Sequence, residues 1–132
     1  MSDGKALLKV REAIISRGSV FRVPGKYPYE EVVDFMVFET FDVQTPYGLM
    51  VTSGYKAGLT LVLLPRESLV EGGISRNWVI ENWREWVYPD CDVSDVCFLS
   101  GYKAPSLARL SGKRRENKNE LIKRENRKGD TH

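Results

Sequence analysis

The chain has 132 residues, of which 42% are hydrophobic and 29% are charged, and its net charge is +2. This composition is typical of one soluble globular domain and excludes a mostly disordered or fibrous chain. The two cysteines cannot supply a disulfide framework, and the only histidine is the last residue, His132. An ordinary zinc site and a nucleophile–histidine pair are therefore excluded, and we expect neither a metal nor a cofactor.

No apolar stretch is long enough to cross a bilayer, and the first twenty residues carry too many charges for a signal peptide. We therefore expect a cytoplasmic protein with no membrane partner.

The elements are predicted here in chain order. Apolar residues at helical spacing (Leu7, Val10, Ile14) predict an N-terminal amphipathic helix that ends at Gly18. A second helix is predicted from an N-cap at Ser75 to about Val87. Five strands are predicted over residues 19–23, 32–41, 48–53, 59–64 and 93–99, with connections over 24–28, 42–47 and 54–58 and a polar loop over 66–73.

Short links between consecutive strands favour antiparallel pairing. The predicted fold class is α+β: an antiparallel sheet of about five strands, an N-terminal helix, a second helix between strands four and five, and a basic C-terminal tail. The strand over 32–41 is apolar on both faces near its middle, which predicts a central position in the sheet. We expect one domain over residues 1–111 and a charged tail, flexible or partly helical, over 112–132.

The tail carries eight basic and four acidic residues, a net charge of +4. Its cations could contact phosphates, so one alternative is a small nucleic-acid-associated protein that uses this tail. Four interleaved acids and the lack of an aromatic residue for base stacking argue against that alternative. A solvated, fraying helix explains the same pattern.

Asp34 lies inside an apolar strand, and a buried carboxylate needs a partner. We expect Lys, Arg or a backbone N–H to satisfy it structurally. The weaker alternative is a small enzyme that uses Asp34 or Glu30, but the sequence shows no second carboxylate that converges with either.

Acidic residues cluster between positions 81 and 95, beside Trp83, Trp86 and Tyr88. A solvated helix face over an aromatic core is one interpretation of this pattern. The other is a binding surface for a basic protein, because clustered charge speeds association and Trp and Tyr are typical anchors. The cluster consists of Glu81, Glu85, Asp90, Asp92 and Asp95, opposed by Arg84 alone.

One five-residue repeat follows two predicted strands: residues 53–57 and 100–104 both read SGYKA. Two strand ends that use the same turn chemistry would explain it. The alternative is a binding surface at one edge that presents Tyr55 with Lys56 and Tyr102 with Lys103.

Several stretches together resemble the immunity protein 45 family of bacterial polymorphic toxin and contact-dependent growth inhibition systems. The resemblance covers roughly residues 9–99. The stretches that carry it are 9–14, 16–26, 33–36, 51–58, 63–65 and 78–95.

The resemblance implies a non-enzymatic immunity protein. Such a protein binds and neutralises the toxic C-terminal domain of a cognate effector, here expected to be a nuclease, in the cytoplasm. The family supplies no catalytic residues. The expected partner is therefore this toxin domain rather than nucleic acid, and the expected partner-binding residues are those of the acidic cluster with Trp86, Tyr88 and the two Tyr-Lys pairs.

Overall fold

The computed structural model describes residues 4–25 and 31–107. The chain divides into two units, Met1–Tyr102 and Lys103–His132, and the strands described below belong to the first. The expected tail over 112–132, with His132, lies outside the described residues, as does Glu30. The domain boundary at residue 111 stays a prediction.

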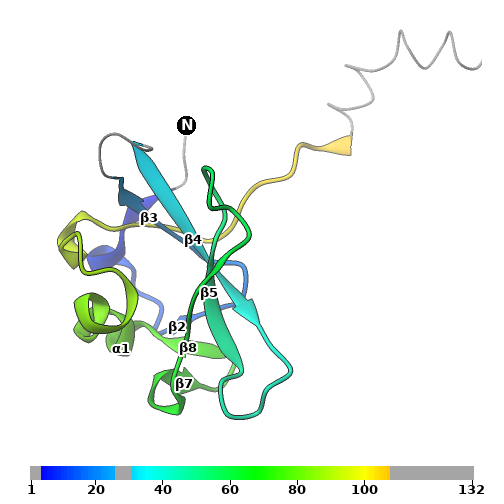
Figure 1. The fold of residues 1–132 in the computed structure, drawn as a ribbon, viewed down its shortest axis with the longest axis vertical. Helices are drawn as coiled ribbons and strands as arrows, with labels where there is room; N and C mark the ends of the chain where they lie inside the picture. Colours follow the sequence, from blue (N-terminus) through cyan, green and yellow to red (C-terminus); the bar gives the residue numbers. More distant parts are fainter. Residues whose placement is uncertain (1–3, 26–30, 108–132) are drawn as a thin grey trace, which may run out of the picture. The chain divides into compact units, whose positions relative to one another are not determined.

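Two antiparallel sheets build the first unit (Figure 1). The main sheet has six strands in the order β1-β9-β3-β4-β5-β6, and the small sheet has three in the order β2-β8-β7. The main-sheet strands are β1 (Lys5–Ala6), β3 (Val20–Pro24), β4 (Val32–Glu39), β5 (Tyr47–Val51), β6 (Thr60–Leu63) and β9 (Cys97–Leu99). The small-sheet strands are β2 (Ile14–Ile15), β7 (Leu69–Val70) and β8 (Gly73–Ser75).

The long strand β4 lies between β3 and β5, which confirms the predicted central position. Alternation along β4 sends Phe35 and Val37 into the core, where they are buried, while Met36 and Phe38 point to the other face and are half-buried. The first of these faces is called the inner face here, and the second the outer face.

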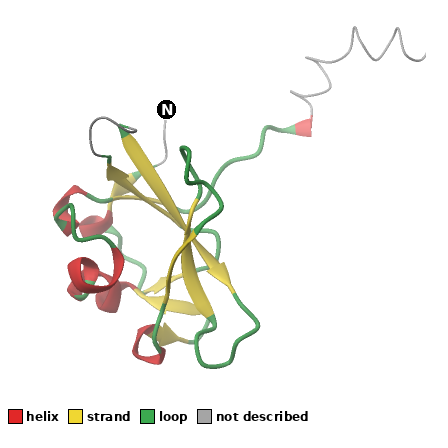
Figure 2. Ribbon diagram, viewed as in Figure 1, coloured by secondary structure: helices red, strands yellow, loops and turns green. Residues whose placement is uncertain are grey.

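The helical segments gather on one side of the main sheet (Figure 2). They are the 3₁₀ helices η1 (Leu7–Lys9), η2 (Arg66–Ser68) and η4 (Val93–Asp95), the α-helix α1 (Arg76–Glu81) and the π-helical turn η3 (Trp83–Val87). The Trp83 ring meets Phe21 of β3 edge-on at a centroid distance of 5.6 Å, and Tyr88 meets Phe35 at 5.3 Å. The aromatic contacts therefore join the helical layer to the inner face.

The predicted second helix begins where expected, because the Ser75 hydroxyl accepts a hydrogen bond from the Trp78 amide and caps α1. The helix is shorter than predicted. The α-helix ends at Glu81, and a π-helical turn carries the chain on to Val87. The wider turn keeps Val79, Trp83 and Val87 buried but leaves Trp86 39% exposed.

The predicted N-terminal helix is wrong. Residues 5–15 form β1, η1 and β2 instead, because Ala6 pairs with Cys97 and Ile15 with Ile74. The apolar spacing misled the prediction. Leu7 and Val10 are buried, but Ile14 is 44% exposed, so the helical stripe has no continuous buried face.

The predicted number of strands is also wrong: the described residues form nine. The five predicted strands exist as β3, β4, β5, β6 and β9, although the last covers only Cys97–Leu99 because η4 takes up the start of that run. The four additional strands have two or three residues each and carry too little alternation to be read from sequence. One of them, β7, lies in the predicted polar loop over 66–73.

The small sheet allows a test of backbone crowding at two adjacent glycines. A Cβ on Gly73 would collide with the carbonyl oxygen of Ile15, whereas a Cβ on Gly72 would have room but would suffer from a φ of +95°. We expect Gly73→Ala to lower the free energy of unfolding by about 2–3 kcal/mol and Gly72→Ala by about 1 kcal/mol. Urea unfolding measures both, and equal losses would contradict the crowding.

Candidate functional site

The acidic cluster is called the acidic ridge here and is defined by Glu81, Glu85, Asp90, Asp92 and Asp95. All five side chains are exposed. Buried residues alternate with them along the chain and hold the ridge against the core: Val79, Trp83, Val87, Cys91 and Val96. The structure therefore places these acids in solvent, as the pattern predicted.

Asp92 caps the 3₁₀ helix η4 within the ridge. Its Oδ2 accepts hydrogen bonds from the Ser94 hydroxyl at 2.5 Å and from the Ser94 amide at 3.2 Å, which caps η4. These hydrogen bonds lower the pKa of Asp92 below its usual value. The ridge therefore keeps this negative charge even in mildly acidic solution.

The aromatic residues beside the ridge separate into exposed and buried members. Trp86 is 39% exposed and leans on Trp78 at a centroid distance of 5.7 Å, so its position is supported. Tyr88 is half-buried against Phe35, and burial together with the charge of Asp90 raises the pKa of its hydroxyl. Trp83 is 1% exposed and belongs to the core, so only Trp86 offers a large apolar surface next to the acids.

Asp34 is 3% exposed and makes four hydrogen bonds to the side chains of three residues. Arg22 of the neighbouring strand donates from Nε to Oδ1 at 2.7 Å and from Nη2 to Oδ2 at 2.8 Å. The Tyr102 hydroxyl donates to Oδ2 at 2.7 Å, and the Asp34 amide donates to the Ser53 hydroxyl at 2.9 Å. Of the expected partners Lys, Arg and a backbone N–H, the structure shows an arginine, Arg22.

Burial alone would raise the pKa of Asp34. The hydrogen bonds from Arg22 and Tyr102, with the charge of Arg22, outweigh burial and hold the pKa below its usual value. The hydrogen bond to Asp34 correspondingly raises the pKa of Arg22. A carboxylate with both oxygens engaged and a lowered pKa is suited to holding strands together rather than to abstracting protons.

The two copies of the repeat meet at Asp34, one at its backbone amide and the other at its carboxylate. Ser53 comes from the first copy and Tyr102 from the second, and the Tyr102 hydroxyl also lies 2.6 Å from the hydroxyl of Thr52. Because the Tyr102 hydroxyl donates its only proton to Asp34, the Thr52 hydroxyl is the donor in its hydrogen bond with Tyr102. The second copy therefore stabilises the fold through the hydrogen bond from Tyr102 to Asp34, which its sequence did not reveal.

The first copy presents its tyrosine differently. Gly54 has a φ of +75°, and the turn leaves Tyr55 67% exposed with the Lys56 ammonium 5.7 Å from the ring centroid. Tyr55 and Lys56 therefore remain candidates for partner contact. Tyr102 donates to Asp34 but is still 46% exposed, and Lys103, which opens the second unit of the chain, is exposed, so both also stay predictions.

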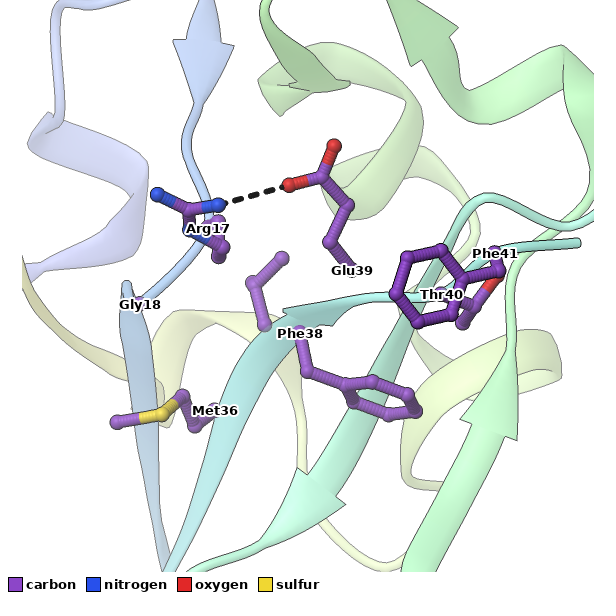
Figure 3. Close-up of a pocket in the computed structure, with 8 residues that line it drawn as sticks. Arg17, Gly18, Met36, Phe38, Glu39, Thr40 and Phe41 are labelled. Atoms are coloured by element: carbon purple, nitrogen blue, oxygen red, sulfur yellow. Dashed lines mark hydrogen bonds and ion pairs between the residues drawn. The ribbon is translucent and has the colours of Figure 1, made fainter.

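A groove on the outer face was missed by sequence reasoning. It has a volume of about 590 Å³ and is lined by Arg17, Gly18, Met36, Val37, Phe38, Glu39, Thr40 and Phe41 (Figure 3). The predicted strand ran through Phe41, but β4 ends at Glu39, and Phe41 projects from the following loop. An aromatic residue at the end of the apolar run, just before Asp42, was the signal of this arrangement.

Metal-binding clusters and membrane-spanning helices are absent from the described ranges. Residues 4–25 and 31–107 contain no group of three His, Cys, Asp or Glu side chains that could hold a metal ion. None of the helices in these ranges has the length and apolar character needed to span a bilayer.

The fold and its surface define a small, mainly antiparallel α+β protein that displays charged and aromatic side chains. The family model of immunity protein 45 matches residues 7–98, more than half of the chain. The chain therefore belongs to the immunity protein 45 family, as the sequence resemblance indicated. No curated protein and no solved structure matches it. Membership of this family implies an immunity role through binding of a cognate toxin protein, and the family is generally non-enzymatic.

The Asp34 interactions predict a specific dependence on pH. Because the folded-state pKa lies below the unfolded value of about 3.9, the stabilisation is complete above that value and is lost as the pH falls through the folded pKa. Asp34→Asn should lower the free energy of unfolding at pH 7 by about 2 kcal/mol. Denaturant unfolding at several pH values should show this gap shrinking below pH ~4, and a gap independent of pH would contradict the assignment.

The contribution of Tyr102 is tested by a double-mutant cycle. Tyr102→Phe removes the hydrogen bond to Asp34 and should cost about 1 kcal/mol in the wild-type chain. In an Asp34→Ala background the same substitution should cost less, with a coupling of at least about 0.5 kcal/mol. Thermal and urea unfolding of the four proteins supply the cycle, and additive losses would show that the two groups are independent.

Proposed function

We propose that this protein binds and neutralises the toxic C-terminal domain of a cognate bacterial effector in the cytoplasm, and that this toxin is a nuclease. The single observation that carries the proposal is the family match over residues 7–98. The chain would act as an inhibitor through contact alone, since neither its sequence nor the bonding of Asp34 suggests a reaction of its own.

The acidic ridge is proposed as the toxin-binding surface. Its five carboxylates are exposed, and Arg84 is the only basic residue between positions 81 and 95. Such a surface attracts a basic protein over several ångströms and accelerates encounter. Trp86 adds a supported, partly exposed ring of the type that often dominates interface energetics.

The charge of the ridge supports a nuclease as the target. A nuclease must hold a polyanion, so its substrate-binding surface is rich in Lys and Arg. A row of carboxylates on a fixed helical layer resembles that polyanion in charge and can cover the surface that holds it. The proposed mode of inhibition is therefore occlusion of the nucleic-acid-binding surface.

Identification of the toxin is the first experiment. Full-length protein and a version that ends at Ser111 serve as baits in the native host, with elution in steps of increasing salt. One stoichiometric protein held by both baits, whose purified C-terminal domain degrades nucleic acid and is inhibited by this chain, is the expected result. Nucleic acid that elutes at modest salt and is lost with the tail would contradict the proposal.

The placement of the interface is tested with matched double variants. Glu81→Gln with Glu85→Gln removes two charges from the ridge, and Glu31→Gln with Glu71→Gln removes two exposed charges from hairpin turns elsewhere. We expect the ridge pair to weaken toxin binding by about 2–4 kcal/mol and to flatten its salt dependence. The control pair should change both quantities little. Titration calorimetry at two salt concentrations makes the comparison, and equal effects would exclude the ridge as the contact.

A further inference from the structure

One aromatic pair, Trp78 of α1 and Trp86 of η3, reaches the surface of the helical layer (Figure 1). The ring centroids lie 5.7 Å apart, and the ring planes are tilted by 54°. The backbone explains this contact: the Asn82 amide donates to the Trp78 carbonyl, and the Trp86 amide donates to the Asn82 carbonyl, both at 2.9 Å. Residues 78, 82 and 86 therefore form one row along this segment, called the aromatic row here.

The π-helical turn η3 leaves Trp86 at the surface. The Tyr88 amide donates to the Trp83 carbonyl at 3.0 Å, five residues back along the chain, which widens the turn. Trp83 and Val87 stay in the core at 1% and 5% exposure, while Trp86 is 39% exposed. Turns of this kind are frequent at functional sites. A large ring that a second ring already holds in place loses little conformational entropy when a partner covers it.

Two carboxylates, Glu81 and Glu85, border the aromatic row. Each comes one position before a member of that row, so the two form a neighbouring row with a spacing of four residues. Both are exposed, and neither makes an ion pair within residues 4–25 and 31–107. Arg84, the nearest base along the chain, lies close enough to Asp92 to help lower its pKa, after the hydrogen bonds from Ser94. The charge of the two glutamates is therefore available to a partner.

A guanidinium group fits this combination of rings and carboxylates better than an ammonium group does. The planar guanidinium stacks on an indole face through cation–π attraction, while its N–H fork donates two hydrogen bonds to a carboxylate. An ammonium group is a compact, strongly hydrated charge, which gains from the carboxylates but little from the ring. The surface therefore favours arginine over lysine at equal net charge.

We infer that Trp86 anchors an arginine of the toxin. The guanidinium stacks on the exposed part of the Trp86 ring, and Glu81 and Glu85 accept its hydrogen bonds. Trp78 is a positioning residue, because it holds the Trp86 ring in place. The inference rests on the proposed function for the identity of the partner and adds the side chain that this partner presents.

Two peptides of equal charge test the inference without the toxin. Dye-labelled hexa-arginine and hexa-lysine are titrated with the full-length protein at low salt, and fluorescence anisotropy gives both dissociation constants. Attraction to the acidic ridge acts on both peptides alike, so a difference between them reports on the guanidinium group. We expect hexa-arginine to bind at least about fivefold more tightly than hexa-lysine.

Matched variants separate the Trp86 ring from general effects. Trp86→Leu should reduce the preference for hexa-arginine to less than about twofold, and Trp86→Phe, which keeps a ring, should retain part of it. Phe41→Leu is the control, since Phe41 is 107% exposed in a loop where the preceding Glu39 is already paired with Arg17. Its preference should equal that of the wild type. Thermal unfolding verifies that every variant is folded.

Equal binding of the two peptides to the wild type would overturn the inference, as would a preference that Trp86→Leu leaves unchanged. With the captured toxin, replacement of surface arginines by lysine one at a time supplies a double-mutant cycle. One replacement should weaken binding to the wild type at least about fivefold and have little effect in Trp86→Leu.

The failure of this inference is distinguishable from the failure of the proposed function. A toxin that wild type and Trp86→Leu inhibit equally well would overturn the inference and leave the proposed function intact. A captured partner that is not a toxin would contradict the proposed function alone, because the peptide ratio would still assign an arginine to Trp86.

Discussion

The main sheet is joined by one ion pair between a buried carboxylate and a partly exposed arginine. Asp34 on the central strand is 3% exposed and accepts hydrogen bonds from Arg22 on one neighbouring strand and from Tyr102, the last residue of the first unit. Its backbone amide reaches Ser53, which follows the other neighbouring strand. The Asp34 carboxylate thus ties β4 to β3 and to the segment after β9, and the Asp34 backbone amide adds the end of β5. A buried charge is stable while all of its partners are present. Removal of any one partner leaves the charge partly uncompensated and lowers the free energy of unfolding.

The two faces of the main sheet differ in what covers them. The inner face is covered by the helical layer through aromatic contacts such as Phe21 with Trp83. The outer face has no such layer in the described chain; Val20 and Leu99 are buried there beside the ion pair, while Met36 and Phe38 remain half-buried. The ridge belongs to the helical layer and the groove to the outer face, so the two features lie on opposite sides of a single sheet.

Much of this arrangement could be predicted from the sequence, and the failures have physical causes. The long strands and the N-cap at Ser75 were predictable because alternation and capping are local signals. The N-terminal segment was not, because β1 depends on β9 and β2 on β8, and these partners lie more than fifty residues away. Family resemblance and acid clustering indicated the immunity role and the exposed ridge. They could not reveal the groove, because it forms only where β4 ends at Glu39 and a side-chain-braced loop turns Phe41 outward.

The position of β9 in the sheet has a consequence for how the chain reaches its folded state. β9 comes last along the chain but lies between β1, the first strand, and β3. During synthesis β1 has no partner, and the outer edge of β3 stays open, until residues 97–99 have left the ribosome. Tyr102 follows only three residues later and completes the bonding of Asp34. The main sheet therefore closes by inserting a late strand between two early ones, a topology of high contact order in which assembly follows translation rather than accompanying it.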